Sequence, residues 1–394
     1  MHKKTSDFFF QIFEKHKIPE VYQGVELKLL NKIDNNVAYS DHSNAIHSVL
    51  FVPDYLNPIL DRDVYKVKSV EQFFKGYTID LRSFKTADAY IKDKFRSNAK
   101  GIRRKIRRLE TCFSISYKYY YGKIELDEYN RLLDLLYEMI VNRFEQRNEK
   151  SHNLPRWEYY KEIYFDLINK KEALLFVVYD EEKPIMISLN NLYNHHLFSS
   201  VSSFDTDYAK FSLGSLEIYK KLEWCISNNV ISYEMGMGDL TYKKDWSNYI
   251  YPFRHHIVFP KEASYIDTIK ANLEYVKVSI KEYLFKTFYQ KYKNYKESKK
   301  SDPEPKVNYK IIEVVTNELP KNKKEINFRE NDSYTVLKRL VFDFLYTTSV
   351  HKSVVKTFYF PDVNTVLITD EKDNHQVVQF DGDYDLSGKL LFTS

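Results

Sequence analysis

The most constraining feature of this sequence is a run of strand candidates that leads into a helix and another strand. Segments 173–179, 185–192 and 197–204 are strand candidates in quick succession, separated by short turns, which predicts an antiparallel meander. A helix over 214–228 and a strand over 231–235 follow. A strand, a helix and a strand in that order require a crossover and a parallel pair. The chain therefore predicts a mixed sheet and an α/β (α+β) fold class.

Further elements are predicted before this unit. We expect a polar helix from the N-cap residue Thr86 to about Leu109, interrupted at Gly101, and then a strand over 114–121. Apolar residues that recur every three or four positions predict an amphipathic helix over 127–147 with one buried face. These helices are expected to flank the sheet.

The segment after the unit ends in a long helix. A short helix near 242–249 and a strand over 256–259 come first. For the long helix, packing of an apolar stripe against the fold is the first interpretation. Its lysines and aromatic rings over 281–300 leave a membrane surface or a nucleic acid as the alternative. The stripe consists of Ile266, Ile269, Leu273, Val276, Ile280, Leu284 and Phe288.

Length and composition indicate a folded chain of more than one domain. Its 394 residues exceed what one core usually organises, and 43% hydrophobic with 29% charged residues is typical of a globular protein. Ser301–Pro305 is the best candidate for a linker, and 306–394 is expected to form a small α+β domain. Two cysteines cannot build a disulfide framework, and no apolar run approaches a signal peptide or a bilayer span. We expect a cytoplasmic protein, or one peripheral to the inner membrane, with no integral membrane segment.

One candidate site lies where a strand ends and the helix over 214–228 begins. A helix start presents unpaired N–H groups and the positive end of the macrodipole, which suit a pyrophosphate. The alternative is that Ser212 only caps the helix and Gly214 only turns the chain. The candidate donor-binding residues are Phe211, Ser212, Leu213, Gly214 and Ser215.

A second candidate site follows the strand over 231–235. Gly236 and Gly238 leave room there for a ligand or another backbone. Next along the chain come a potential base, a proton donor and a cation. The alternative is a tight turn into a helix with a solvated polar face. These three residues are Asp239, Tyr242 and Lys243.

Together the two segments resemble the second half of the GNAT acetyltransferase fold. The pattern over 208–216, with that over 236–246, looks like the CelD-like (cellulose-biosynthesis type) branch of this superfamily, which is related to the FemAB peptidyltransferases. Residues 96–109 are similar to the basic helix that precedes the acyltransferase half of these proteins, and 142–144 resemble the end of their next helix. The resemblance covers roughly residues 77–260.

The resemblance implies tandem GNAT-like mixed sheets flanked by helices. Residues 1–120 would form an N-terminal GNAT-like half with the basic helix, 121–300 a GNAT acyltransferase domain with a trailing amphipathic helix, and 306–394 the small α+β domain. The implied donor substrate is acetyl-CoA, held by its pyrophosphate at Phe211–Ser215. The implied acceptor is an amine or an amino sugar of a polysaccharide or cell-envelope precursor, and no metal is implied. Phe211 and Leu216 depart from the usual pyrophosphate motif, which has Arg or Gln at the first position and a small residue at the second.

The resemblance also implies direct attack of the acceptor on the thioester. Asp239 or Glu234 would help deprotonate the acceptor, and Tyr242 would protonate the departing thiolate. The residues expected on the acceptor side are Gly236, Gly238, Lys243 and Trp246.

Basic residues crowd the segment 92–108, where they could neutralise phosphates of tRNA, CoA or an anionic lipid. A solvated helix that covers the sheet through Ile102, Ile106 and Leu109 is the alternative. Two further functions stay open: a FemAB-like transferase that uses aminoacyl-tRNA, and a degenerate GNAT-fold protein that binds nucleic acid or an anionic membrane surface. The arginines concerned are Arg96, Arg103, Arg104, Arg107 and Arg108.

Overall fold

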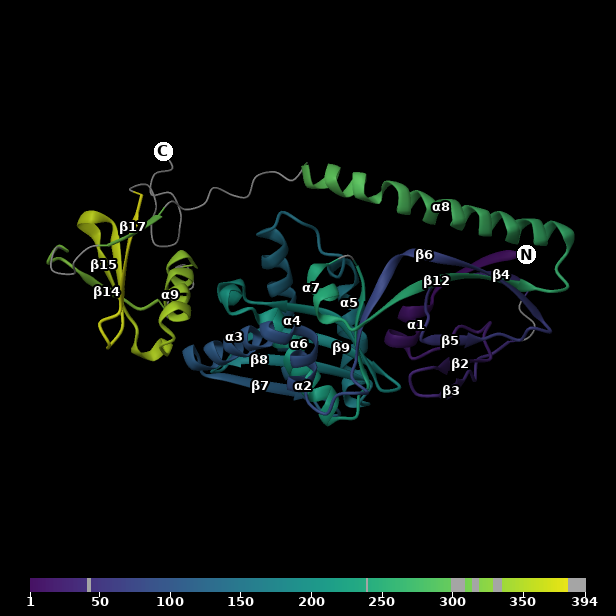
Figure 1. Ribbon diagram of the computed structural model, residues 1–394, viewed down its shortest axis with the longest axis horizontal. Helices are drawn as coiled ribbons and strands as arrows, with labels where there is room; N and C mark the ends of the chain where they lie inside the picture. Colours follow the sequence, from purple (N-terminus) through teal and green to yellow (C-terminus); the bar gives the residue numbers. More distant parts are fainter. Residues whose placement is uncertain (41–43, 239, 299–308, 314–318, 329–334, 382–394) are drawn as a thin grey trace.

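The computed structural model describes residues 1–40, 44–238, 240–298, 309–313, 319–328 and 335–381. Its largest element is a nine-stranded sheet in the order β1-β4-β12-β6-β11-β10-β9-β8-β7 (Figure 1). The predicted mixed sheet is confirmed, because two of its strand pairs are parallel and the others antiparallel. The strands are β1 (His2–Asp7), β4 (Ala45–Pro53), β6 (Tyr65–Asp80), β7 (Ile115–Tyr120), β8 (Ala173–Asp180), β9 (Lys183–Tyr193), β10 (His196–Phe204), β11 (Ser232–Met237) and β12 (Tyr249–Pro260).

The predicted meander and crossover are both confirmed. Strands β8, β9 and β10 pair antiparallel in sequence order. Helix α6 (Leu213–Ser227) then returns the chain, so that β11 lies parallel to β10.

Helices cover both faces of this part of the sheet, since its strands divide their apolar residues between two cores. Leu174 and Phe176 of β8 face a core shared with α2, α3 and α6, whereas Leu175 and Val177 face the core of α4 and α5. Successive strand residues point to opposite faces, so a continuous apolar run suits a sheet that is covered on both sides. The helices are α2 (Ala87–Phe95), α3 (Ala99–Cys112), α4 (Leu126–Glu145), α5 (Trp157–Asn169) and α7 (Thr241–Trp246).

The basic segment forms two helices rather than one. Thr86 caps α2 as predicted, since its hydroxyl oxygen accepts a hydrogen bond from the Ala89 N–H at 3.0 Å. The predicted interruption at Gly101 is wrong, because the chain breaks at Arg96, which has a φ of 49°. Helix α3 continues through Gly101, where a single glycine costs only about 1 kcal/mol relative to alanine.

Strand β6 connects the N-terminal strands to the meander, because it lies between β12 and β11. Gly76 of β6 pairs directly with Tyr251 of β12, whose ring is fully buried. A Cβ atom at Gly76 would overlap that ring. The absence of a side chain at Gly76 therefore makes room for Tyr251 in the core.

We expect Gly76→Ala to lower the free energy of unfolding by about 1–3 kcal/mol, because overpacking a buried ring forces its neighbours apart. Denaturant unfolding of both proteins measures the difference. Gly101→Ala is the matched control, since a Cβ there meets nothing within 4 Å, and it should be neutral or stabilising. Equal losses in the two variants would contradict the packing argument.

The remaining N-terminal elements form a smaller layer. Helix α1 (Phe8–Lys15) and a three-stranded sheet in the order β3-β2-β5 enclose an aromatic core with β4 and β12. These strands are β2 (Gly24–Leu27), β3 (Lys32–Asn35) and β5 (Leu56–Ile59).

In the C-terminal region, the residues that the structure describes form a five-stranded sheet and one α-helix, α9 (Thr335–Thr348). The helix joins the core near the start of α6, because the Phe342 ring lies 5.0 Å from that of Phe113 and 4.7 Å from that of Tyr208. The predicted linker Ser301–Pro305 lies outside the described residues. The strand order is β13-β17-β16-β15-β14, formed by β13 (Tyr309–Ile312), β14 (Lys324–Ile326), β15 (Lys356–Phe360), β16 (Thr365–Thr369) and β17 (His375–Phe380).

Helix α8 (Tyr265–Ser298) runs along the outside of β6 and β12 (Figure 1). Ala271 and Val278 are among its residues that are buried there. The helix packs on the sheet as predicted, but not through the predicted apolar stripe, whose seven residues are 40–66% exposed. Among the described helices, none is both long and apolar enough to cross a membrane.

Candidate active site

The candidate site is centred on the point where β10 and β11 stop pairing. The two strands pair only from His196–Phe198 to Ser232–Glu234, although β10 continues to Phe204 and β11 to Met237. Gly236 and Gly238, which follow this point, have φ angles of 70° and 125° that favour glycine. Strands β10 and β11 therefore separate beside the glycine turn. Helix α6 begins shortly after β10 ends.

The predicted donor-binding residues divide into packed and open ones. Phe211 and Leu213 are buried, and the Phe211 ring lies 5.1 Å from Phe113 and 5.3 Å from Tyr346 of α9. Gly214 and Ser215 are only half-buried, and a Cβ at Gly214 would meet nothing within 4 Å. The first turn of α6 is therefore anchored on one side and open on the other.

Ser212 differs from the predicted cap. It occupies the N-cap position of α6, but its φ is 57° and its side chain makes no capping hydrogen bond. Its carbonyl oxygen accepts the Ser215 N–H at 2.9 Å. The turn before α6 is instead fixed by Asp205, whose carboxylate accepts the Asp207 N–H at 3.0 Å.

A buried ion pair lies inside the first turns of α6. Lys221 has no exposed side-chain surface and contacts the carboxylate of Glu217. Its Nζ also lies 3.4 Å from the hydroxyl oxygens of Ser199 and Tyr233. Burial lowers the pKa of Lys221, and the Glu217 carboxylate opposes that shift. The pair thereby connects α6 to both of the strands that separate.

Glu217 also connects the buried ion pair to residues further along β10. Its second carboxylate oxygen accepts the Ser202 hydroxyl at 2.8 Å. Beyond it, the Arg143 guanidinium at the end of α4 lies 4.5 Å from the centre of the Phe204 ring. Burial, and next the charge of Arg147, lower the pKa of Arg143. A mostly buried row of charged and hydroxyl groups thus follows the unpaired part of β10.

Glu234 lies on the opposite face of β11, in contact with the N-terminal region. Its carboxylate accepts the Gly236 N–H at 2.7 Å and the Tyr55 hydroxyl at 3.1 Å. Burial raises the pKa of Glu234 to about 7, against the lowering effect of the Gly236 N–H and the neighbouring tyrosines. A carboxyl group with this pKa can exchange a proton near neutral pH.

Lys243 of α7 reaches back to the glycine turn. Its Nζ donates to the Met237 carbonyl oxygen at 2.6 Å. Burial lowers the pKa of Lys243 to about 8, and the charge of Glu234 opposes this shift. The structure therefore brings together four of the predicted residues, namely Glu234, Gly236, Gly238 and Lys243.

The other predicted residues of this segment have different surroundings. Tyr242 is about half exposed, whereas Trp246 is 4% exposed and its ring lies 4.9 Å from Phe95. The Tyr90 hydroxyl donates to the Trp246 carbonyl oxygen. Asp239 lies outside the described residues.

Residues 96–244 match the family described as acetyltransferase (GNAT) domain. This segment is a GNAT-type domain. The match extends from the break before α3 to α7, so it includes the opened sheet, the start of α6 and the glycine turn. Comparison with curated protein sequences gives no match.

Solved structures show weak likeness to the chain. FemX is 11% identical over 46% of this chain and 61% of its own, with a TM-score of 0.36. L-PGS from Bacillus licheniformis is 14% identical over 59% and 72%, with a TM-score of 0.35. A tandem GNAT protein from the clavulanic acid biosynthesis pathway is 10% identical over 56% and 65%, with a TM-score of 0.28. At these values the likeness says nothing about a substrate.

Sequence reasoning missed several polar groups of the GNAT-type domain and its surroundings. Glu217 and Lys221 are spaced four apart in a helix that also contains Lys220 and Glu223, so the spacing indicates an ion pair but not its burial. Tyr55 gave no such signal, because it lies 179 residues before the Glu234 that it contacts.

A cavity of about 620 Å³ adjoins the GNAT-type domain where β10 ends. Asn142 and Gln146 of the α4 end line it together with Phe204, Thr206 and Arg339 of α9. The predicted donor residues 211–215 do not line this cavity. It lies between the end of α4 and the turn that leads to α6.

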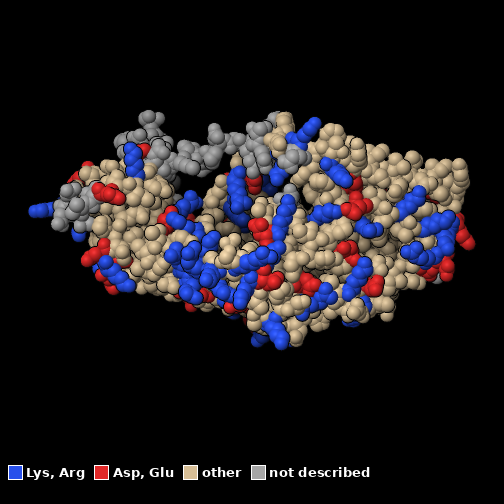
Figure 2. All heavy atoms as spheres, viewed as in Figure 1, with Lys and Arg blue, Asp and Glu red and all other residues tan. Residues whose placement is uncertain are grey.

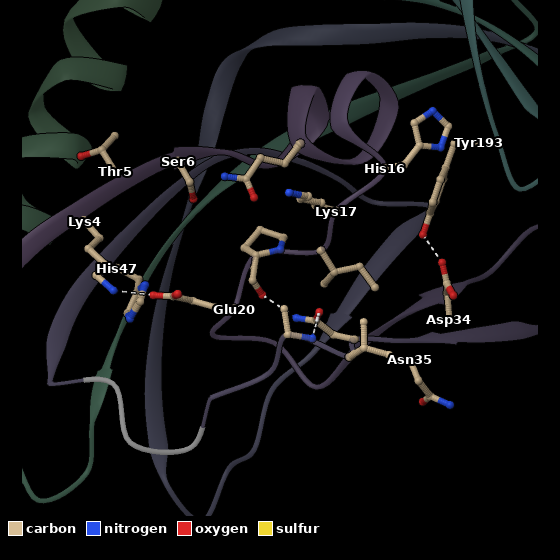
Figure 3. Close-up of a pocket in the computed structure, with 16 residues that line it drawn as sticks. Lys4, Thr5, Ser6, His16, Lys17, Glu20, Asp34, Asn35, His47 and Tyr193 are labelled. Carbon is tan, nitrogen blue, oxygen red and sulfur yellow. Dashed lines mark hydrogen bonds and ion pairs between the residues drawn. The ribbon is translucent and has the colours of Figure 1, made fainter. Parts of the chain in front are cut away.

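A larger cavity of about 800 Å³ lies in the N-terminal region (Figure 3). Lys4, Lys17 and His47 line it together with Asp34, whose carboxylate accepts the Tyr193 hydroxyl. It contains none of the predicted site residues.

Lys and Arg side chains gather over α3 at the edge of the GNAT-type domain (Figure 2). Arg103 is paired with Asp88 at 2.6 Å, and the Arg108 guanidinium lies 4.6 Å from the centre of the Tyr346 ring. Arg96, Arg104 and Arg107 are exposed. Ile106 and Leu109 are buried on the other face, so α3 both covers the sheet and presents a basic surface.

Proposed function

We propose that this protein is an acyltransferase of the CelD-like branch that transfers an acetyl group from acetyl-CoA to an amine or amino sugar. Polysaccharide or cell-envelope precursors are the acceptors that the family resemblance favours. The observation that carries the proposal is the coincidence of three features in one GNAT-type domain. These are the end of β10–β11 pairing, the open first turn of α6 at Gly214, and the glycine turn bound to Glu234.

The donor would lie along the unpaired edge of β10, with its pyrophosphate at the start of α6. The open space beside Gly214 and the half-buried Ser215 support this placement. Phe211 and Leu213 would anchor the turn from the core side rather than touch the donor, because both are buried.

In the reaction, the acceptor nitrogen would attack the thioester carbonyl carbon and the C–S bond would break. The proton lost by the nitrogen would pass to Glu234 or Asp239, and the thiolate would take a proton from Tyr242. The raised pKa of Glu234 supports its part, since proton transfer is most efficient when the pKa lies near the working pH. Lys243 and the turn 236–238 would help to bind the acceptor. The contacts of Lys243 with this turn support a shared role for them.

The proposal is tested by thermal unfolding of the full chain with CoA, acetyl-CoA and deacylated tRNA in turn. A ligand at about 100 times its Kd stabilises the native state by about 2.7 kcal/mol, so CoA and acetyl-CoA should raise the midpoint by several degrees. Gly214→Phe should abolish this shift by filling the open space. Gly101→Phe, at an equally open helix position, should retain it. An unchanged CoA shift in Gly214→Phe would remove the donor assignment.

An aminoacyl-tRNA donor is the second candidate, supported by the exposed arginines of α3. In that case deacylated tRNA, and not CoA, should raise the midpoint, and the effect should fall steeply with salt. Arg104→Glu with Arg107→Glu should remove the tRNA shift and leave any CoA shift intact.

A further inference from the structure

Helix α8 carries a continuous stripe of aliphatic side chains on the face turned away from the protein. The exposed stripe recurs at alternating spacings of three and four through Ile266, Ile269, Leu273, Val276 and Ile280. Such a repeat keeps one seam along a helix and normally lies against a partner. Within the described residues, this seam is 40–66% exposed.

The acidic groups of α8 lie on the opposite side. Asp267 is paired with the amino group of Met1 at 2.7 Å, and Glu274 with Lys3 at 2.5 Å. Glu282 is buried and accepts the Phe73 N–H at 2.8 Å. These three are the only carboxylates in residues 265–295 of the sequence, so the outward face of that stretch carries no negative charge.

Lysines flank the apolar seam instead. Lys277 and Lys281 are exposed beside it, together with the aromatic side chains of Phe285, Phe288 and Tyr292. A depression of about 500 Å³ on this face is lined by Ile280, Leu284, Phe288 and their neighbours. The outward face therefore combines aliphatic, aromatic and cationic groups.

This combination of side chains indicates which kind of partner fits the outward face of α8. A second copy of α8 would bring lysines against lysines, because neither helix has an outward carboxylate to pair with them. A nucleic acid would satisfy the lysines but would leave the aliphatic seam exposed to water. An anionic lipid surface satisfies both, since apolar side chains enter the boundary between headgroups and acyl chains while lysines reach the phosphates.

We propose that α8 docks the protein on an anionic membrane surface through this outward face. The inference does not depend on the acyltransferase assignment, because α8 lies outside the residues that match the GNAT domain. The helix would lie in the plane of the interface, its inward face still packed on β6 and β12. The domain would then be held next to the lipid surface.

The test is co-sedimentation of the full chain with vesicles of phosphatidylcholine alone and of phosphatidylcholine with phosphatidylglycerol at 3:1. We expect at least tenfold tighter binding to the anionic vesicles. Leu273→Glu with Ile280→Glu should reduce that binding at least tenfold without loss of folded structure, because both residues are exposed. Lys277→Gln with Lys281→Gln should remove the preference for anionic vesicles.

The matched control is Ile33→Glu with Leu126→Glu, which changes two exposed apolar residues elsewhere by the same chemistry. This control should bind as the parent protein does. Equal vesicle binding by the α8 and control variants would overturn the proposal. The proposal would also be overturned if the parent protein did not bind anionic vesicles but bound tRNA through α8, or formed a dimer that Leu273→Glu disrupts.

Discussion

Replacing Lys221 by methionine is expected to lower the free energy of unfolding by about 3–5 kcal/mol, because a buried carboxylate then loses its cation. Neither side chain of the pair has more than 9% of its surface exposed. The Lys221 Nζ also lies close to hydroxyl groups of Ser199 and Tyr233, which lose a donor in the variant. Urea unfolding of both proteins at neutral pH measures the loss.

Two comparisons separate the ion pair from simple loss of a side chain. Glu217→Leu combined with Lys221→Met should recover most of the stability, since apolar residues of similar volume can replace a buried pair at little cost. Lys161→Met removes one partner of the more exposed pair with Asp134, at 2.9 Å, and should cost less than about 1 kcal/mol. A Lys221→Met loss no larger than that of Lys161→Met would show that the pair does not stabilise the opened sheet.

The order of the elements was predictable because it is local. The meander, the α6 crossover and the parallel β11 follow from apolar runs and turn residues that are close together in sequence. The face that α8 buries was not predictable in this way, because its inward contacts come from residues nearly the whole chain away. Met1 and Lys3 bind Asp267 and Glu274, and small side chains such as Ala271 approach the sheet. The predicted apolar stripe was left on the outside.

The positions of the candidate site residues along the chain were predictable, but their burial and their hydrogen-bond partners were not. The sequence pointed to Glu234, Gly236 and Lys243, which are close together along the chain, and the structure shows them in one turn. It gave no sign that Tyr55 would cover Glu234 from another part of the chain. The properties that matter for proton transfer, burial and long-range hydrogen bonds, arise only when the chain is folded.

Glu234→Gln is expected to change how stability depends on pH. The folded pKa of Glu234 is about 7, against an ordinary value of 4.5. Because the folded chain holds this proton more tightly than the unfolded chain, its contribution is fully present below pH 4.5 and is lost as the pH rises towards 7. The parent protein should therefore lose about 3 kcal/mol relative to the glutamine variant over this interval, at about 1.4 kcal/mol for each unit of pKa.

Unfolding of both proteins at intervals from pH 3 to 8 measures this difference, and Glu128→Gln provides a control of opposite sign. A hydrogen bond from Arg131 lowers the pKa of Glu128 below its ordinary value of 4.5, so the parent should gain stability relative to Glu128→Gln as the pH rises towards 4.5, and the difference should stay constant above that pH. The pH dependence of kcat/KM in the same Glu234→Gln protein distinguishes a role of Glu234 in proton transfer from a role in positioning the glycine turn. If Glu234 is the base, the parent's kcat/KM should rise with pH, with a midpoint near 7 and a plateau above it, and the variant should lose both that limb and most of its rate. A stability difference combined with an unchanged pH profile would make Glu234 a group that holds the glycine turn, with the acceptor proton going elsewhere.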